Sequence, residues 1–340
     1  MLVCDLRSDT VTQPTTSMRQ AMFDAVVGDD VFDEDPTIHR LQERVASLAK
    51  MDAGLYVPSG TMANQIALLL HCRAGDDVLL GENSHIYLYE SGAGAAIAGV
   101  QFTSVGHGGH FTAAELRAAI KTTDAAGHVP PSTLVSVENT HNRGGGLVMS
   151  IEQFAEITDV AREFNLGVHI DGARIFNAAA ALGCGIHEWT ERADTASICL
   201  SKGLGAPVGS VLCGSDRLIG RAKRYRKMLG GGMRQAGLIA AAGLYALEHH
   251  IPVLVDDNRR AFEFACAIDS MPKAQIHPDS VRSNIVIFSV DGSAQAVCDA
   301  VADSVRVLPI SESQIRAVFH HQVDDQALAH TVDAFRRVLS

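Results

Sequence analysis

Short apolar runs alternate with amphipathic stretches over the first 250 residues of the chain. Runs typical of strands occur at residues 54–57, 77–80, 133–137, 167–170, 196–200 and 209–213. Helices are predicted at residues 61–71, 151–164 and 173–181, and two longer ones at 216–228 and 235–250. Strands that alternate with helices indicate a mostly parallel sheet with helices on both faces. The predicted fold class is therefore α/β.

The pattern changes near Pro252, which ends the last of these helices. Beyond it the chain has two further strand-like runs, at residues 284–290 and 316–320, each with a helix after it. A length of 340 residues suits one large domain plus a small one. We therefore expect a large domain over residues 1–251, including an N-terminal arm, and a small C-terminal α+β domain over 252–340.

The amino-acid composition of the chain argues against some classes of binding partner. The formal net charge of -11 argues against nucleic acid or an anionic membrane as the main partner. No apolar run reaches the ~20 residues of a membrane helix, and the N-terminus opens with Asp5, Arg7 and Asp9 rather than a targeting segment. The seven cysteines contain no Cys-x-x-Cys pair. We therefore expect reduced thiols in a cytoplasmic protein, and no zinc or other metal site.

Candidate chemistry lies where predicted strands end. Lys202 follows the strand at 196–200 and Asp171 follows the strand at 167–170, at the edge where open α/β sheets bind ligands. A lysine amine forms an imine with an aldehyde, and a carboxylate facing a pyridine nitrogen keeps that nitrogen protonated. The alternatives are a surface lysine in a turn and an aspartate that caps a helix. The pair together favours pyridoxal phosphate, carried as a Schiff base on Lys202.

Three weaker signals fit the same cofactor. Ser59, Gly60 and Thr61 join a strand to a helix, where backbone amides and a hydroxyl can hold phosphate, although a plain glycine turn has the same pattern. His85 follows the strand at 77–80 and can stack on a flat ring, although a lone histidine is more often an ordinary surface or core group. Arg174 can orient or neutralise Asp171.

The sequence resembles the low-specificity L-threonine aldolases, which are pyridoxal-phosphate enzymes of the aspartate-aminotransferase-like fold, called fold type I. The resemblance rests on seven stretches in the right order: DLRSDTVT (5–12), VGDDV (27–31), VPSGT (57–61), ENTHN (138–142), HIDGARIFN (169–177), CLSKGLGAPVG (199–209) and KMLGGGMRQ (227–235). The last 90 residues match only loosely.

The resemblance implies a role for each matching position. Lys202 would form the Schiff base, Asp171 would face the ring nitrogen, and His85 would stack on the ring. Other residues would serve the phosphate (Gly60, Thr61), the substrate carboxylate (Ser8, Arg174, Arg316), the β-substituent (Tyr89, His128) and a neighbouring subunit's site (Lys227, Arg234). The family is usually a homotetramer, arranged as a dimer of dimers.

The implied reaction is the reversible cleavage of L-threonine, L-allo-threonine and related β-hydroxy-α-amino acids to glycine and an aldehyde. His85, His128 or a water that they hold are the candidates for the base. Departures from the family pattern at Phe32, Arg143 and Phe319 bear on substrate preference. Two alternatives remain: another reaction on the same scaffold, such as β-elimination or alanine racemisation, and a binding protein without catalysis.

Overall fold

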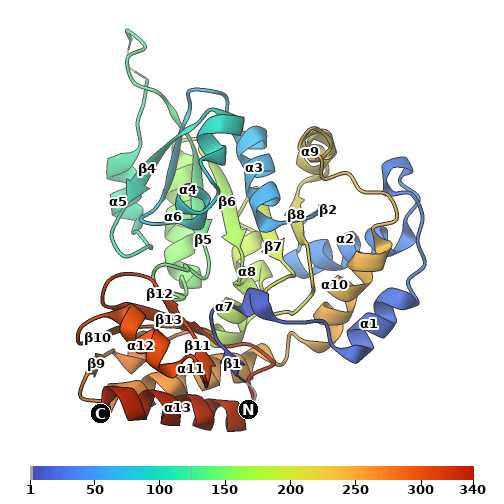
Figure 1. The fold of residues 1–340 in the computed structure, drawn as a ribbon. Coiled ribbons are helices and arrows are strands. Elements are labelled where there is room, and N and C mark those ends of the chain that lie inside the picture. Colours follow the sequence, from blue (N-terminus) through green and yellow to red (C-terminus); the bar gives the residue numbers. More distant parts are fainter. Residues whose placement is uncertain (1–2, 124) are drawn as a thin grey trace.

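A seven-stranded sheet forms the centre of the chain in the computed structural model, which describes residues 3–123 and 125–340 (Figure 1). Five neighbouring strands run parallel, and the two at the other edge are antiparallel to their neighbours. In spatial order the strands are β2 (Ala53–Val57), β8 (Ser210–Gly214), β7 (Thr195–Cys199), β6 (Gly167–Gly172), β5 (Ser132–Glu138), β3 (Asp77–Gly81) and β4 (Gln101–Val105). The predicted α/β class and mostly parallel sheet are confirmed.

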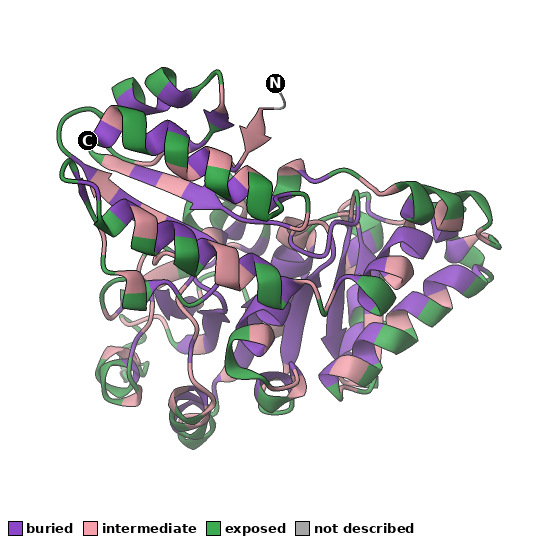
Figure 2. Cartoon of the chain, turned by 90° about the horizontal axis from the view of Figure 1, so that it is seen from below, coloured by how far each residue is buried: buried purple, intermediate pink, exposed green. Residues whose placement is uncertain are grey.

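Helices surround this sheet, and the sheet supplies most of the larger core. Figure 2 shows strands that are almost wholly buried, between helices whose outer sides are exposed. The helices of this part are α1 (Thr16–Phe23), α2 (Pro36–Ala49), α3 (Gly60–His71), α4 (His85–Leu88), α5 (Ala113–Ala119), α6 (Ile151–Glu163), α7 (Ile175–Leu182), α8 (His187–Thr190), α9 (Asp216–Met228) and α10 (Gly237–His249). The helices that the hydrophobic pattern predicts are present, with ends that differ by a few residues.

The small domain has its own sheet and core. Four antiparallel strands lie in the order β12 (Leu308–Pro309), β13 (Gln314–Val318), β10 (Ile285–Val290) and β9 (Ala274–Gln275). The helices α11 (Leu254–Asp269), α12 (Ala294–Val301) and α13 (Asp325–Leu339) accompany this sheet. Helix α11 precedes the first of these strands and was not predicted. Phe319 is fully buried against Phe264, with ring centroids 5.5 Å apart, so this departure from the family pattern fills the core of the small domain.

The N-terminal arm contacts both parts of the molecule. Strand β1 (Cys4–Asp5) pairs with β11 (Val305–Arg306), and Leu6 is buried in the core of the small domain. Helix α1 then packs against α10 of the large domain. The arm therefore joins the two cores, and the division at residues 251 and 252 stays a prediction.

Helix length bears on the expectation about membranes. In the part of the chain that the structure describes, no single helix is long and apolar enough to cross a membrane. One bent pair among these described residues, Gly237–His249 and Ile251–Asp269, has that length and composition when its two helices are taken together, with an angle of 52° between them.

Candidate active site

A cavity of about 440 Å³ contains most of the residues predicted to bind substrate. Its walls come from segments that follow strands β3, β5, β6 and β7, from the N-terminal arm, and from the small domain. The carboxyl ends of the parallel strands meet at one edge of the sheet, which explains why distant sequence segments converge. The lining residues are Ser8, Thr10, His85, Tyr89, Asn142, Arg143, Arg174, Lys202, Leu308, Pro309, Ile310 and Arg316.

Asp171 is buried at the end of β6 and is held by two N–H donors. Its Oδ2 accepts a hydrogen bond from Asn64 Nδ2 at 2.8 Å, and its Oδ1 accepts one from the backbone N–H of Ala173 at 3.1 Å. Acceptance by both oxygens suits an ionised carboxylate, because a protonated carboxyl would have to donate at one of them. Such a carboxylate can hold a proton on a facing pyridine nitrogen.

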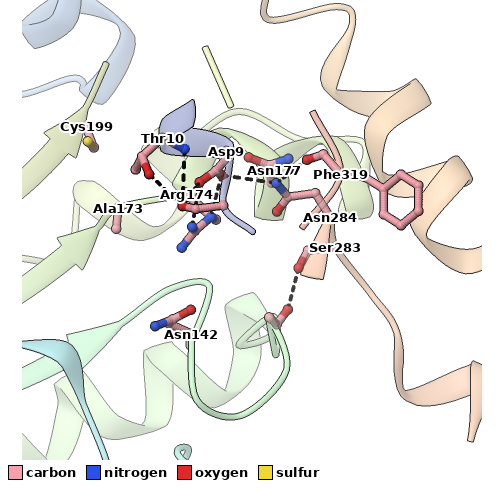
Figure 3. Close-up of polar contacts among 12 residues, drawn as sticks. Asp9, Thr10, Asn142, Ala173, Arg174, Asn177, Cys199, Ser283, Asn284 and Phe319 are labelled. Carbon is pink, nitrogen blue, oxygen red and sulfur yellow. Dashed lines mark hydrogen bonds and ion pairs between the residues drawn. The ribbon is translucent and has the colours of Figure 1, made fainter. Parts of the chain in front are cut away.

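Arg174 pairs with Asp9 and not with Asp171, which corrects the expectation that it neutralises Asp171. Arg174 Nε and one terminal nitrogen each lie 2.6 Å from an Asp9 oxygen (Figure 3). Asn284 Nδ2 donates to the same carboxylate at 3.1 Å. Burial opposes ionisation of Asp9, but the Arg174 guanidinium holds the pKa of that carboxyl below its usual value. The buried pair fixes the arm against the floor of the cavity.

Arg316 lines the cavity and forms no ion pair with a carboxylate of the described residues. Its terminal nitrogens donate to Asn142 Oδ1 at 2.8 Å and to the Arg7 carbonyl at 3.0 Å. Its Nε is buried and has no partner among residues 3–123 and 125–340. Burial and the nearby Arg174 lower the pKa of Arg316. An unpaired guanidinium on a cavity is a binding group for a carboxylate, which can accept two parallel hydrogen bonds.

His85 begins α4 and is held at two points. Its backbone N–H donates to Glu138 Oε2 at 2.6 Å, and its Nδ1 lies 3.2 Å from Oε1 of the fully buried Glu90 side chain. Burial opposes charging of the ring, but the hydrogen bond to Glu90 raises the pKa of His85 above its usual value. The ring therefore has a fixed position at the cavity wall, as a stacking residue requires.

His85, Glu90 and Asp171 also have the geometry of a metal site. Each offers one ligand atom, and these atoms lie within 4.8 Å of one another. Glu90 Oε2 already accepts a hydrogen bond from Gln65 at 2.6 Å, and Glu90 Oε1 and Asp171 Oδ2 share the amide of Asn64. We therefore assign the cluster to a hydrogen-bond network.

The start of α3 has the features of a phosphate site. Ser59 caps the helix by accepting the N–H of Met62, and Gly60 is the first helical residue. Ser210 Oγ is buried without a partner in the described chain, and a Cβ atom on Gly60 would lie 3.6 Å from it. A hydroxyl without a partner beside the free amides of a helix N-terminus fits an anion there. Pyridoxal phosphate is therefore compatible with this end of the site.

Three predicted residues lie neither on this cavity nor at the Asp171 and Gly60 positions described above. His128 is exposed in the loop between α5 and β5, which extends away from the small domain (Figure 1). That loop enters β5 at its amino end, whereas the cavity lies at the carboxyl ends of the parallel strands. Lys227 lines a separate cavity of about 290 Å³, and Arg234 pairs with Asp29 at 3.0 Å.

The sequence reasoning missed four buried polar residues that organise the site: Asp9, Asn64, Glu90 and Glu138. Glu138 accepts the backbone N–H groups of both His85 and Asn142, so it joins two cavity segments. Asp9 and Glu138 lie within motifs that were already recognised. The position of Asp9 and Glu138 inside these motifs is therefore the feature of the sequence from which their roles could have been predicted.

Comparison with known proteins identifies the family. The family model described as "Beta-eliminating lyase" matches residues 5–291 of the chain. The chain belongs to this family. The low-specificity L-threonine aldolase of Escherichia coli K12 is 39% identical over 336 residues, covering 99% of both chains. A probable low-specificity L-threonine aldolase 2 of Arabidopsis thaliana is 40% identical over 342 residues, covering 98% of this chain and 96% of its own.

One further sequence relative has a different name, and one solved structure tests the fold. An alanine racemase, TOXG of Cochliobolus carbonum, is 32% identical over 357 residues and covers 99% of this chain and 87% of its own. The solved threonine aldolase of Leishmania major has a TM-score of 0.84 at 17% identity, covering 99% of this chain and all of that one. The structural likeness confirms the fold, and the sequence relatives confirm the resemblance to the threonine aldolases.

Proposed function

We propose that the protein is a pyridoxal-phosphate-dependent aldehyde-lyase that reversibly cleaves L-threonine, L-allo-threonine and related β-hydroxy-α-amino acids to glycine and an aldehyde. The observation that carries the proposal is one cavity lined by both Lys202 and the unpaired guanidinium of Arg316, with His85 fixed at its wall. An amine that can hold the cofactor and a receptor for an amino-acid carboxylate thus face the same space.

Each residue has a defined task in this reaction. The ε-amine of Lys202 would hold the cofactor, and Asp171 would hold a proton on its ring nitrogen. Pyridoxal phosphate, when bound, supplies the electron sink for the breaking Cα–Cβ bond. Arg316 and Ser8 would bind the α-carboxylate, while Arg174 keeps its charge paired with Asp9. Fixing the carboxylate orients the substrate, and orientation selects the bond that breaks.

The β-hydroxyl proton needs a base near the open side of the cavity. Among the predicted histidines, His85 lines this cavity on its own chain, and Tyr89 lies beside it with ring centroids 5.5 Å apart. His128 can contribute only to the cavity of a second copy, because its loop lies at the amino ends of the parallel strands and the cavity of its own chain lies at their carboxyl ends. This requirement fits a homotetramer in which Lys227 and Arg234 also approach a neighbouring site. We place the enzyme in the cytoplasm.

The decisive experiment is an aldehyde-release assay over β-hydroxy-α-amino acids of both β-configurations, with the wild type and Lys202→Ala. We expect both threonine epimers to be cleaved, with a modest preference, since a single hydrogen bond to the β-hydroxyl is worth about one decade in rate. Lys202→Ala should lose the visible band of the cofactor and nearly all turnover. Absence of glycine and aldehyde from every substrate would refute the proposal.

Alanine racemisation is the second candidate, because of the 32% identity to an alanine racemase over nearly the whole chain. The same scaffold can also support β-elimination. Product analysis separates the three reactions: glycine with an aldehyde, inverted alanine, or ammonia with a keto acid. Chiral chromatography of L-alanine incubated with the enzyme tests the racemase directly.

A further inference from the structure

A chain of polar side chains lies buried behind Asp171. Asn64, on α3, donates from Nδ2 to Asp171 Oδ2 and to Glu90 Oε1, both at 2.8 Å. Its Oδ1 lies 3.1 Å from His169 Nε2. His169 Nδ1 lies 2.9 Å from Thr195 Oγ1, which lies 3.0 Å from His71 Nε2. All of these residues except His71 are buried, and none of them lines the cavity.

In this row of side chains, only one assignment of donors and acceptors is consistent with every hydrogen bond. Ionised carboxylates can only accept, so the nitrogen of the Asn64 amide must face Asp171 and Glu90, and its oxygen must face His169. That oxygen requires a hydrogen on His169 Nε2. Burial lowers the pKa of His169 to about 4, so the ring is neutral and its Nδ1 accepts from the Thr195 hydroxyl. Because the Thr195 hydroxyl donates its one hydrogen to His169, it accepts from His71 Nε2.

We propose that Asn64 is the positioning residue of the cofactor site, holding Asp171 and Glu90 with the two hydrogens of one amide whose orientation is fixed by His169, Thr195 and His71. The proposal rests on the proposed function for the identity of the cofactor. It assigns Thr195 a role in cofactor binding even though three successive hydrogen bonds separate its side chain from Asp171.

The same amide couples two groups that would face the cofactor. Glu90 Oε1 accepts from Asn64 Nδ2 and from His85 Nδ1, so Asp171, which would face the ring nitrogen, and His85, which would stack on the ring, share one anchor. If the amide turned over, its oxygen would face two carboxylate oxygens and its nitrogen would face a donor. Loss of the Thr195 hydroxyl leaves His169 Nδ1 without its donor, so the hydrogen bonds that support the Asn64 amide weaken and both groups are held less firmly.

The test measures cofactor binding without substrate, so it is independent of whether aldol cleavage occurs. Four variants are compared with the wild type: Asn64→Asp, Thr195→Val, Thr195→Ser and, as a matched control, Thr190→Val. Thr190 is also fully buried, but its hydroxyl donates to the Ala49 carbonyl outside the network. The readouts are the dissociation constant of pyridoxal phosphate and the visible absorption maximum of the bound cofactor. Thermal melting of the cofactor-free protein reports the loss of stability that any buried variant causes.

We expect Asn64→Asp to weaken cofactor binding by about tenfold to hundredfold, since hydrogen bonds to charged groups are lost. Thr195→Val should shift affinity and absorption in the same direction by a smaller factor, and Thr195→Ser should restore both. Thr190→Val should lower stability without either effect. Wild-type affinity and absorption in Asn64→Asp, or a Thr195→Val protein that matches Thr190→Val, would overturn the proposal. If Asn64→Asp does not fold, the Thr195 comparison decides. A wild type that binds no pyridoxal phosphate would instead refute the proposed function.

Discussion

At the scale of single residues, Asp171 is the position where a small change has the clearest chemical consequence. Its two oxygens accept N–H groups from Asn64 and Ala173. Asp171→Asn keeps the size of the side chain but removes the charge that would hold a proton on the cofactor ring, so the ring would become a poor electron sink. We expect the variant to bind pyridoxal phosphate and to lose at least about 100-fold in kcat for threonine cleavage. Turnover near the wild-type rate would mean that Asp171 only caps α7.

Arg143 is the departure from the family pattern that bears most directly on substrate choice. It lines the cavity, and its guanidinium donates to the Ile310 carbonyl at 3.4 Å. Within the described chain, no carboxylate lies within 4.0 Å of Arg143 or of Arg316. With Arg316 on the α-carboxylate, Arg143 remains for a second anion, such as the β-carboxylate of 3-hydroxyaspartate.

We therefore expect cleavage of 3-hydroxyaspartate to glycine and glyoxylate, in addition to cleavage of threonine. Arg143→Ala should lower the ratio of kcat/KM for 3-hydroxyaspartate over threonine by about tenfold to hundredfold, the effect of one charge-assisted hydrogen bond. Arg143→Lys should lie between the two proteins. A ratio that does not change in Arg143→Ala would assign the guanidinium to the cavity rim alone.

The sequence predicts the residues of the site better than it predicts their partners. Lys202 and Asp171 were predicted because each lies in a recognised motif at the end of an apolar run, His85 because it follows the strand at 77–80, and Arg316 through the family resemblance alone. The partner of Arg174 could not be predicted, since Asp9 lies 165 residues away along the chain and meets it only in the folded arm. Asn64 gives no signal of its own, because it lies among the apolar residues of a buried helix.

At the scale of helices and strands, burial on both faces decides what can be predicted. The strands β5, β6 and β7 are buried along nearly their whole length and read as apolar runs in the sequence. Strand β4 is the edge strand, and its residues Gln101, Thr103 and Ser104 interrupt the apolar pattern. Helix α11 has a charged stretch, Asp256 to Arg260, that obscures its apolar face. Both elements were therefore missed.

Helix α11 carries a buried carboxyl that makes stability depend on pH. Neither oxygen of Asp257 has a hydrogen-bond partner in the described chain, and the nearest cation, Arg260, is 3.9 Å away. Burial raises the pKa of Asp257 to about 7, with Asp9 and Asp256 adding to the shift and Arg260 opposing it. The folded protein therefore binds a proton that the unfolded chain releases near pH 4, and stability from this group falls as the pH rises from about 4 to 7.

Asp257→Asn should remove the loss of stability that ionisation of this buried carboxyl causes above pH 4. We expect the variant to gain roughly 1–4 kcal/mol in free energy of unfolding relative to the wild type at pH 8, and little at pH 4. Urea denaturation of the cofactor-free protein at both pH values measures the difference. Asp269→Asn is the matched control, because Asp269 is exposed at the other end of the same helix. An equal gain at both pH values would point to packing and not to ionisation.

At the scale of the whole molecule, the N-terminal arm determines how the two domains meet. Leu6 is buried in the core of the small domain, and Asp9 pairs with Arg174 at the end of a strand of the large sheet. Arg316 extends this connection, because it donates to the backbone of the arm and to Asn142. The groups proposed to bind the substrate therefore come from the arm and from both domains, and all three form the walls of the cavity.

The surface beyond this cavity predicts association of several copies. Phe23 is the last residue of α1, Phe32 lies in the turn Asp30–Phe32, and Met228 is the last residue of α9. Their exposed fractions are 81%, 70% and 67%. Exposed apolar side chains that gather in one patch are typical of surfaces that a partner covers, and we expect these three to share such a surface. Lys227 and Arg234 lie in the same part of the sequence, where the family resemblance places groups that reach a neighbouring site.

We expect the wild type to sediment well above the 36.2 kDa of one chain, as a homotetramer. Phe23→Asp combined with Phe32→Asp should dissociate it, because burying an unpaired charge in an interface is costly. Turnover should fall with the assembly, while circular dichroism of the separated chains stays close to that of the wild type. Val255→Asp is the control, since Val255 is 56% exposed on the small domain, away from α1 and α9. A monomer that cleaves threonine at the wild-type rate would show that each chain's cavity is sufficient, and it would remove His128, Lys227 and Arg234 from the list of residues that act between subunits.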